Sequence, residues 1–170
     1  MSDAPHSNGN IAYIDGANLH MGIRSLRKEI DYGKFRKLLL WKYRITTAYL
    51  FIGHIPEYEK LYEHLRQSGY TLIFKETVMQ AGETKGNVDA ELVLRAVRDV
   101  YETQPKQMVI ISGDGDFSCL VDFLQEKQLL KTIIAPNRRY CSYLLRKKKN
   151  LPIVFMDDII TKCEKTPGRH

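Results

Sequence analysis

The stretch QMVIISGDGDF, residues Gln107 to Phe117, joins an apolar run to two carboxylates set among glycines. The apolar, largely β-branched residues at its start predict a buried strand over residues 107–112. Asp114 and Asp116 follow at once, where the chain is expected to turn into an amphipathic helix over residues 116–127. The stretch therefore predicts a strand–turn–helix unit with acidic side chains at the carboxyl end of the strand.

The rest of the chain repeats this alternation of strand and helix. Further strands are predicted over residues 11–15, 45–52, 70–76, 130–135 and 152–156. Further helices are predicted within residues 18–29, 31–41, 56–68, 87–103 and 141–149, and from about residue 157. Residues 77–86 are polar and contain two glycines, so they are predicted to form an exposed loop. Such alternation is typical of an α/β fold with a mostly parallel sheet covered on both faces.

Length and composition predict one domain. A chain of 170 residues that is 44% hydrophobic fits a single core over residues 11–162, with a flexible N-terminal tail over 1–10 and a C-terminal tail over 163–170. No segment approaches the roughly 20 apolar residues that a membrane-spanning helix needs. The three cysteines are far apart and form no Cys-x-x-Cys pair, so the sequence suggests neither a disulfide framework nor a zinc site. We therefore expect a soluble cytoplasmic protein.

Acidic residues recur where predicted strands end. Asp15 closes the strand over residues 11–15, and Asn18 follows three residues later. Ligands of open α/β sheets bind beyond the carboxyl ends of the strands, which is where Asp15, Asp114 and Asp116 are expected. Asp89 opens the helix over 87–103 and begins a stripe at helical spacing whose other members are apolar: Val93, Ala96, Val97 and Val100. Asp89 is therefore expected to point inward.

Each acid alone also fits an ordinary structural role. Asp116 could cap a helix, Asp89 would suit the positive end of a helix dipole, Asp114 could form a turn, and Asp15 could end a strand. Carboxylates that converge, however, repel by about 4 kcal/mol per close pair at an effective dielectric constant near 20. A cation is therefore expected among them. The donors are carboxylate and amide oxygens without His or Cys, which favours one or two Mg²⁺ or Mn²⁺ ions.

The net charge of +6 is concentrated in one segment. Residues 127–156 contain eight basic residues and no Asp or Glu, whereas the remaining sequence carries 18 basic and 20 acidic residues. This asymmetry suggests a polyanionic partner, with nucleic acid favoured over a membrane surface. A solvated basic face that only keeps the protein soluble is the alternative. Together with the metal site, the segment suggests phosphodiester hydrolysis.

Three motifs carry a resemblance to a known family. IAYIDGANL, KGNVDAEL and VIISGDGDF, in this order, resemble the NYN domain, the LabA-like branch of the PIN-like nuclease superfamily, and the likeness covers about residues 11–160. The resemblance implies a Rossmann-like three-layer sandwich with strand order 3-2-1-4-5, and metal-dependent endoribonuclease activity. It implies an acidic cluster with Asn18 as its polar companion, and the cluster consists of Asp15, Asp89, Asp114 and Asp116. It also implies that Ser112 and Lys85 lie near the metal-bound water or the phosphate.

The basic segment supplies the expected RNA contacts. These candidates are Arg138, Arg139, Lys147, Lys148 and Lys149. Many LabA-like sequences carry a further acid six residues after the counterpart of Asp89, where this chain has Arg95, so the number of metal ions stays open. The helical RNA-reading domains of some larger relatives are missing, so any sequence choice would come from this domain or from a protein partner. The sequence is also compatible with a homodimer.

Three other functions fit parts of the pattern. A catalytically weak or inactive RNA-binding module would share the fold and charge, and only turnover would separate it from a nuclease. A phosphatase of the haloacid dehalogenase type would need a second Asp where this chain has Ala17. A metal-dependent glycosyltransferase would need more chain for its donor and acceptor sites. The endoribonuclease prediction is therefore preferred.

Overall fold

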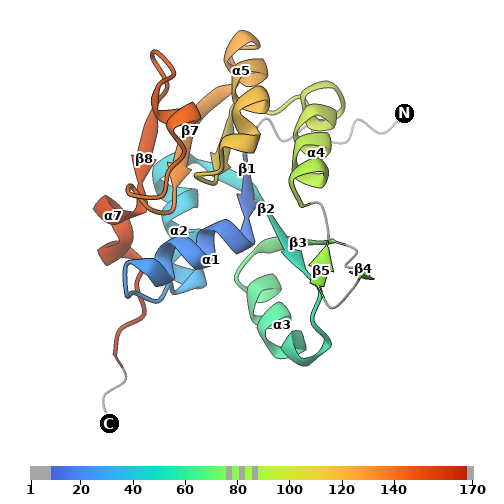
Figure 1. Ribbon diagram of the computed structural model, residues 1–170, viewed down its shortest axis with the longest axis vertical. Coiled ribbons are helices and arrows are strands. Elements are labelled where there is room, and N and C mark those ends of the chain that lie inside the picture. Colours follow the sequence, from blue (N-terminus) through green and yellow to red (C-terminus); the bar gives the residue numbers. More distant parts are fainter. Residues whose placement is uncertain (1–8, 76–77, 81–82, 86–87, 168–170) are drawn as a thin grey trace.

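A parallel sheet forms the middle layer of the protein (Figure 1). The computed structural model describes residues 9–75, 78–80, 83–85 and 88–167. The six strands have the order β3-β2-β1-β6-β7-β8 and are all parallel. Their bounds are β1 Asn10–Asp15, β2 Ile45–Gly53, β3 Tyr70–Lys75, β6 Met108–Ile111, β7 Leu130–Ala135 and β8 Ile153–Phe155. Each predicted strand is found, and the predicted order is confirmed, with β8 added outside β7.

One face of the sheet is covered by the helices α1 (Gly16–Ser25), α2 (Tyr32–Tyr43), α3 (Glu59–Gln67) and α7 (Met156–Ile159). Successive side chains of a strand point to opposite faces, and Ala12 and Ile14 of β1 point to this one. They pack with α1 residues such as Leu19 and α2 residues such as Phe35, all of which are buried. The short 3-10 turns η1 (Pro56–Tyr58) and η3 (Ile160–Lys162) adjoin α3 and α7.

The other face is covered by α4 (Val88–Glu102), α5 (Ser118–Glu126) and the single-turn helix α6 (Tyr143–Arg146). Ile11 and Tyr13 of β1 point to this face and pack in the same cluster as Leu92 of α4 and Leu120 of α5. The 3-10 turn η2 (Gly115–Phe117) connects β6 to α5. Both faces of the central strands are thus covered, which explains why their sequences are apolar at almost every position.

The structure corrects the prediction for residues 77–86, which were expected to form a loop. Residues 78–80 (β4) and 83–85 (β5) pair as an antiparallel hairpin outside the main sheet, while residues 77, 81, 82 and 86 lie outside the described part. Both strands are only three residues long and mostly polar, so no alternating apolar pattern marked them.

The two chain ends also differ from the expected tails. Asn10 is the buried first residue of β1, and its side-chain amide donates to the Tyr43 carbonyl at 2.7 Å. Cys163 is fully buried, and Glu164 pairs with Ile30 in an antiparallel bridge. Cys163 and Glu164, expected in the C-terminal tail, therefore pack on the domain. No helix within the described residues is long and apolar enough to cross a membrane.

Candidate metal centre

Asp15 stands at the end of the central strand β1 and at the start of α1. Its carboxylate caps α1 by accepting a hydrogen bond from the Asn18 backbone N–H at 3.2 Å. The other carboxylate oxygen accepts from the Ser112 hydroxyl at 3.2 Å. Gly16 lets the start of α1 lie close to β2, because a Cβ at that position would lie 2.8 Å from the Phe51 carbonyl oxygen and 2.4 Å from Ile52. Asp15 is only 5% exposed, so these bonds fix its direction.

Asp114 lies in the loop that follows β6, the neighbour of β1. The pairing of Ile14 with Ile111 places Asp15 and Ser112 side by side at the carboxyl edge of the sheet. The Asp114 backbone N–H donates to the Ser112 hydroxyl at 3.1 Å, and the Asp114 carboxylate caps η2 by accepting from the Asp116 N–H at 2.9 Å. Ser112 is therefore bonded to both acidic segments.

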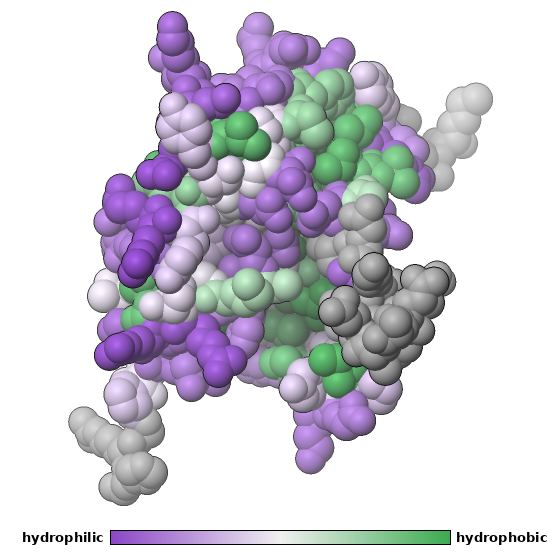
Figure 2. Space-filling model, in the orientation of Figure 1, coloured by the Kyte–Doolittle hydropathy of each residue, from purple (hydrophilic) through white to green (hydrophobic). Residues whose placement is uncertain are grey.

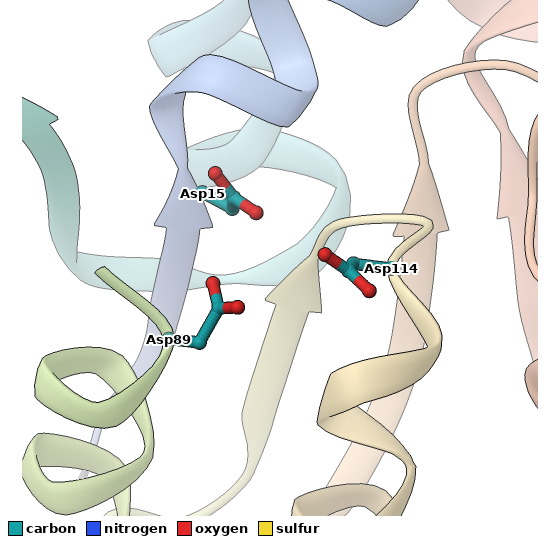
Figure 3. A group of neighbouring side chains, drawn as sticks. All are labelled: Asp15, Asp89 and Asp114. Carbon is teal, nitrogen blue, oxygen red and sulfur yellow. The ribbon is translucent and has the colours of Figure 1, made fainter. Parts of the chain in front are cut away.

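Asp89, in the first turn of α4, completes an acidic triad with Asp15 and Asp114 (Figure 3). One carboxylate oxygen from each of the three residues lies within 4.8 Å of the other two. The three side chains come from β1, α4 and the loop after β6, and Figure 3 shows them facing a common space. Segments far apart in the sequence thus converge on one point of the sheet edge.

The triad is electrostatically unfavourable when it is fully ionised. Burial raises the pKa of Asp15, and the charges of Asp89 and Asp114 raise it further, against hydrogen bonds from Asn18 and Ser112 that lower it. Burial, Asp114 and Asp116 raise the pKa of Asp89, while Lys75 at the end of β3 lowers it. Among the described residues, no ion pair involves any of the three triad carboxylates. Within the described residues, their mutual repulsion is therefore offset by hydrogen bonds to Asp15 and Asp114 and by the charge of Lys75 rather than by an ion pair.

The comparison with protein families identifies the family of this chain. The family model of the NYN domain matches residues 11–151. The chain belongs to the NYN domain family. NYN domains are part of a nuclease-like superfamily, for which an acidic cluster at the sheet edge fits metal binding. The LabA-like branch is a finer division of this family and stays a prediction.

The fold is similar to that of a solved structure. A protein of unknown function from Vibrio parahaemolyticus superimposes with a TM-score of 0.75 at 24% identity, covering 96% of this chain and all of the other. At this identity the likeness shows the fold alone. No curated protein sequence matches the chain significantly.

Two of the predicted site residues lie beside the triad rather than in it. Asp116 is exposed, and its carboxylate acts on Asp89 through its charge. Asn18 is half-buried, and its side-chain oxygen accepts from the Gly113 N–H at 2.9 Å, which ties α1 to the loop after β6. Lys85 is the last residue of β5, but its side chain lies outside the described part.

The five basic residues predicted to contact RNA in this NYN domain divide into two groups. Arg138 pairs with Asp158 at 2.6 Å and stacks over the Phe155 ring at 4.1 Å, and Lys148 pairs with Asp122. The others are exposed and form no ion pair within the described residues: Arg139, Lys147 and Lys149. The segment adjoins the triad loop, since a Cβ on Gly115 would lie 2.4 Å from the Ser142 hydroxyl.

Sequence reasoning missed a buried network on α4. Asp99 is 1% exposed; it accepts from the Tyr13 hydroxyl at 2.8 Å and pairs with Arg95 at 3.2 Å. Arg95 also bonds to the Tyr49 hydroxyl, and its guanidinium lies 4.5 Å from the Tyr49 ring centre. The spacing of Arg95 and Asp99, four residues apart on a helix, was the available signal.

Proposed function

We propose that this NYN domain is a metal-dependent endoribonuclease that hydrolyses RNA phosphodiester bonds, with Asp15, Asp89 and Asp114 holding one or two Mg²⁺ or Mn²⁺ ions. The observation that carries the proposal is the convergence of the three carboxylates within 4.8 Å from three separate elements. At this separation each ionised pair repels by roughly 3 to 4 kcal/mol at an effective dielectric constant near 20. A divalent cation would relieve that repulsion.

The donor atoms fit a hard cation. The cluster offers carboxylate oxygens, which are the ligands that Mg²⁺ and Mn²⁺ prefer, and within the described residues no His or Cys joins it. Asp116, exposed and within electrostatic reach of Asp89, is proposed to contribute through water or to a second ion.

The residues around the triad have complementary roles. When bound, the ion would lower the pKa of an attacking water and offset charge on the phosphate. Ser112 holds Asp15 next to Asp114 by hydrogen bonds to both residues. Asn18 fixes the loop after β6 against α1 by its bond to Gly113. In the reaction the attacking water loses a proton to solvent as its oxygen forms a new bond to phosphorus. The bond to the leaving ribose oxygen breaks, and that oxygen takes up a proton from solvent. Substrate would be held by the exposed residues of the basic segment, of which Arg139 follows the carboxyl end of β7.

Activity tests this proposal directly. An end-labelled single-stranded RNA and a DNA of the same sequence are incubated with Mn²⁺, with Mg²⁺, or with excess EDTA. We expect RNA to be cut only with metal. We also expect cutting to continue when the 2′-hydroxyl at the cleaved position is removed, because water is the attacking group. Undiminished cleavage in EDTA would contradict the metal requirement. Loss of cleavage without the 2′-hydroxyl would contradict water attack.

An RNA-binding module without turnover is the second candidate. The observation that favours it is Arg95, because many LabA-like sequences carry an acid at this position. Arg95 forms an ion pair with Asp99 and a hydrogen bond to the Tyr49 hydroxyl, so the position supplies no metal ligand. Metal and RNA binding without any cleavage in the same assay would select this candidate.

A further inference from the structure

A recess opens beside the acidic triad, between α1 and the loop that follows β7. It encloses about 410 Å³ and is lined mainly by apolar surface. Met21 of α1 and Tyr140 of the loop line the recess, as does Pro136, which lies against Gly22. A Cβ on Gly22 would lie 2.4 Å from Pro136, so only glycine lets helix and loop approach this closely.

The side chains at the mouth are apolar and exposed. Met21 is 67% exposed and Tyr140 is 65% exposed, and neither belongs to the two core clusters. Covering apolar surface is favourable by roughly 25 cal/mol of free energy per Å² removed from water. A flat, apolar ligand would therefore be stabilised there. On the face drawn in Figure 2, pale-green apolar side chains over α1 border a hydrophilic centre.

The recess and the acidic site share residues. Asn18 and Gly113 line the recess, and they are bonded to each other at 2.9 Å. Asn18 also donates its backbone N–H to Asp15, and Gly113 precedes Asp114. Within the described residues, the Asn18 side-chain NH₂ group donates no hydrogen bond. A group seated in the recess would therefore lie next to whatever the carboxylates bind.

One exposed cation, Arg139, lies next to Tyr140 at the recess. Arg139 is exposed, forms no ion pair among the described residues, and places its guanidinium 5.6 Å from the Tyr140 ring centre. An aromatic ring beside a free arginine is the combination that holds a base and its phosphate in single-stranded nucleic acids. An apolar peptide segment would make no use of that charge.

We infer that the recess takes one unpaired nucleobase of the RNA strand, next to the phosphate held over the triad. The inference rests on the proposed function and adds to it a preference for single-stranded RNA. The base stacks on Tyr140 and contacts Met21, and the Asn18 amide offers a donor to its edge. A base held in a duplex is stacked and paired, and it cannot enter the recess without being extruded.

Binding to two probes of equal charge tests the inference without requiring cleavage. A uridine decamer and an abasic ribose-phosphate decamer are titrated in EDTA and followed by fluorescence anisotropy. We expect the wild-type protein to prefer the uridine decamer by about 5-fold or more, because stacking contributes per base. Tyr140→Ala should reduce this preference, while Tyr140→Phe should keep it. Tyr143→Ala, at a residue 68% exposed but outside the recess, is the matched control.

The outcomes separate the two proposals. Equal binding of both probes by the wild-type protein, an unchanged preference in Tyr140→Ala, or an equal loss in Tyr143→Ala would overturn the recess as a base site, even if metal-dependent cleavage is found. Loss of the preference in Tyr140→Ala alone would support it, even if no cleavage is found and the nuclease proposal fails.

Discussion

Ser112 shows how single hydrogen-bonding groups arrange the acidic triad. A serine hydroxyl has one donor and two acceptor positions, and here it donates to Asp15 while it accepts from the Asp114 backbone. Ser112 is 1% exposed, so both bonds are shielded from water. The hydroxyl thus holds two repelling segments together before any ion is bound.

Replacing Asp15 separates its roles in chemistry and in folding. We expect Asp15→Asn to abolish turnover and to raise the melting temperature of the metal-free protein at neutral pH, because it removes a buried charge while Asn can still cap α1. Mn²⁺ should raise the melting temperature of the wild-type protein more than that of the variant. Calorimetry and an RNA cleavage assay measure these effects. If the variant unfolds, Asp15 is structural.

The stability difference between Asp15→Asn and the wild-type protein should depend on pH. The pKa of Asp15 is raised on folding above its ordinary value of 3.8, so ionisation costs more in the folded protein. Below that value both states are protonated and the penalty is absent. The penalty develops as pH rises towards the folded pKa and is constant above it. The advantage of the variant should therefore shrink as pH falls, with Glu126→Gln at the exposed end of α5 as the control.

At the level of elements, α4 shows what the sequence could and could not predict. Periodicity placed the helix correctly and predicted an inward stripe from Asp89 through Val100. The most buried positions are instead Leu92, Ala96 and Asp99, with the predicted valines half-buried beside them. The burial of Asp99 could not be predicted from hydrophobic periodicity, because a carboxylate is buried only where it has polar partners. Those partners are Tyr13 of β1 and Arg95 of α4.

The sheet and two of the acids could be predicted from the sequence, whereas the features that depend on loops could not. The strands were predictable, since buried parallel strands are continuous apolar runs. Their order, which makes β1 and β6 neighbours, was predicted from the resemblance to the NYN domain. Asp15 and Asp114 were predictable as neighbours, because both follow adjacent strands. The hairpin of β4 and β5, the exclusion of Asp116 from the triad and the proximity of Lys75 to Asp89 depend on loop geometry that no local pattern encodes.

Arg95 anchors α4 to the sheet, and its removal should be costly. We expect Arg95→Gln to reduce the free energy of unfolding by about 1 to 3 kcal/mol, because Asp99 would remain buried without its cation. The loss of unfolding free energy should be smaller than that for breaking a fully buried pair, since the Arg95 side chain is 37% exposed. Urea denaturation measures the change. Mn²⁺ affinity should stay near the wild-type value.

The control for Arg95→Gln is Arg98→Gln on the same helix. Arg98 pairs with Glu102 at the same spacing, but both side chains are more than half exposed. We expect its effect to be within about 0.5 kcal/mol. Equal losses in the two variants would mean that helix propensity, and not the buried pair, controls the stability.

On the scale of the whole molecule, the fold places opposite charges side by side. The acidic triad lies at the sheet edge, and the segment of residues 127–156 runs along the neighbouring β7, α6 and β8. The segment's charge is only partly available, because Arg138 and Lys148 are paired with Asp158 and Asp122. Among the five predicted RNA contacts, Arg139, Lys147 and Lys149 are exposed and form no ion pair within the described residues, and we call them the unpaired basic set.

Two sets of substitutions test whether this unpaired basic set holds RNA. Replacing it with Ala should weaken binding about equally for unrelated RNA sequences, because phosphate contacts carry no base information. The slope of log affinity against log salt should flatten by roughly 0.7 for each phosphate of the single strand that the variant no longer neutralises. The control, Arg138→Ala with Lys148→Ala, should change the slope less, since the charges it removes are already neutralised within the protein. Mn²⁺ binding, followed calorimetrically, should be unchanged in both, because none of these residues belongs to the triad.

Unchanged affinity and slope in the first set would mean that the segment is only a solvated face. The RNA path would then have to run over other cations near the triad, beginning with Lys75, whose charge already acts on Asp89.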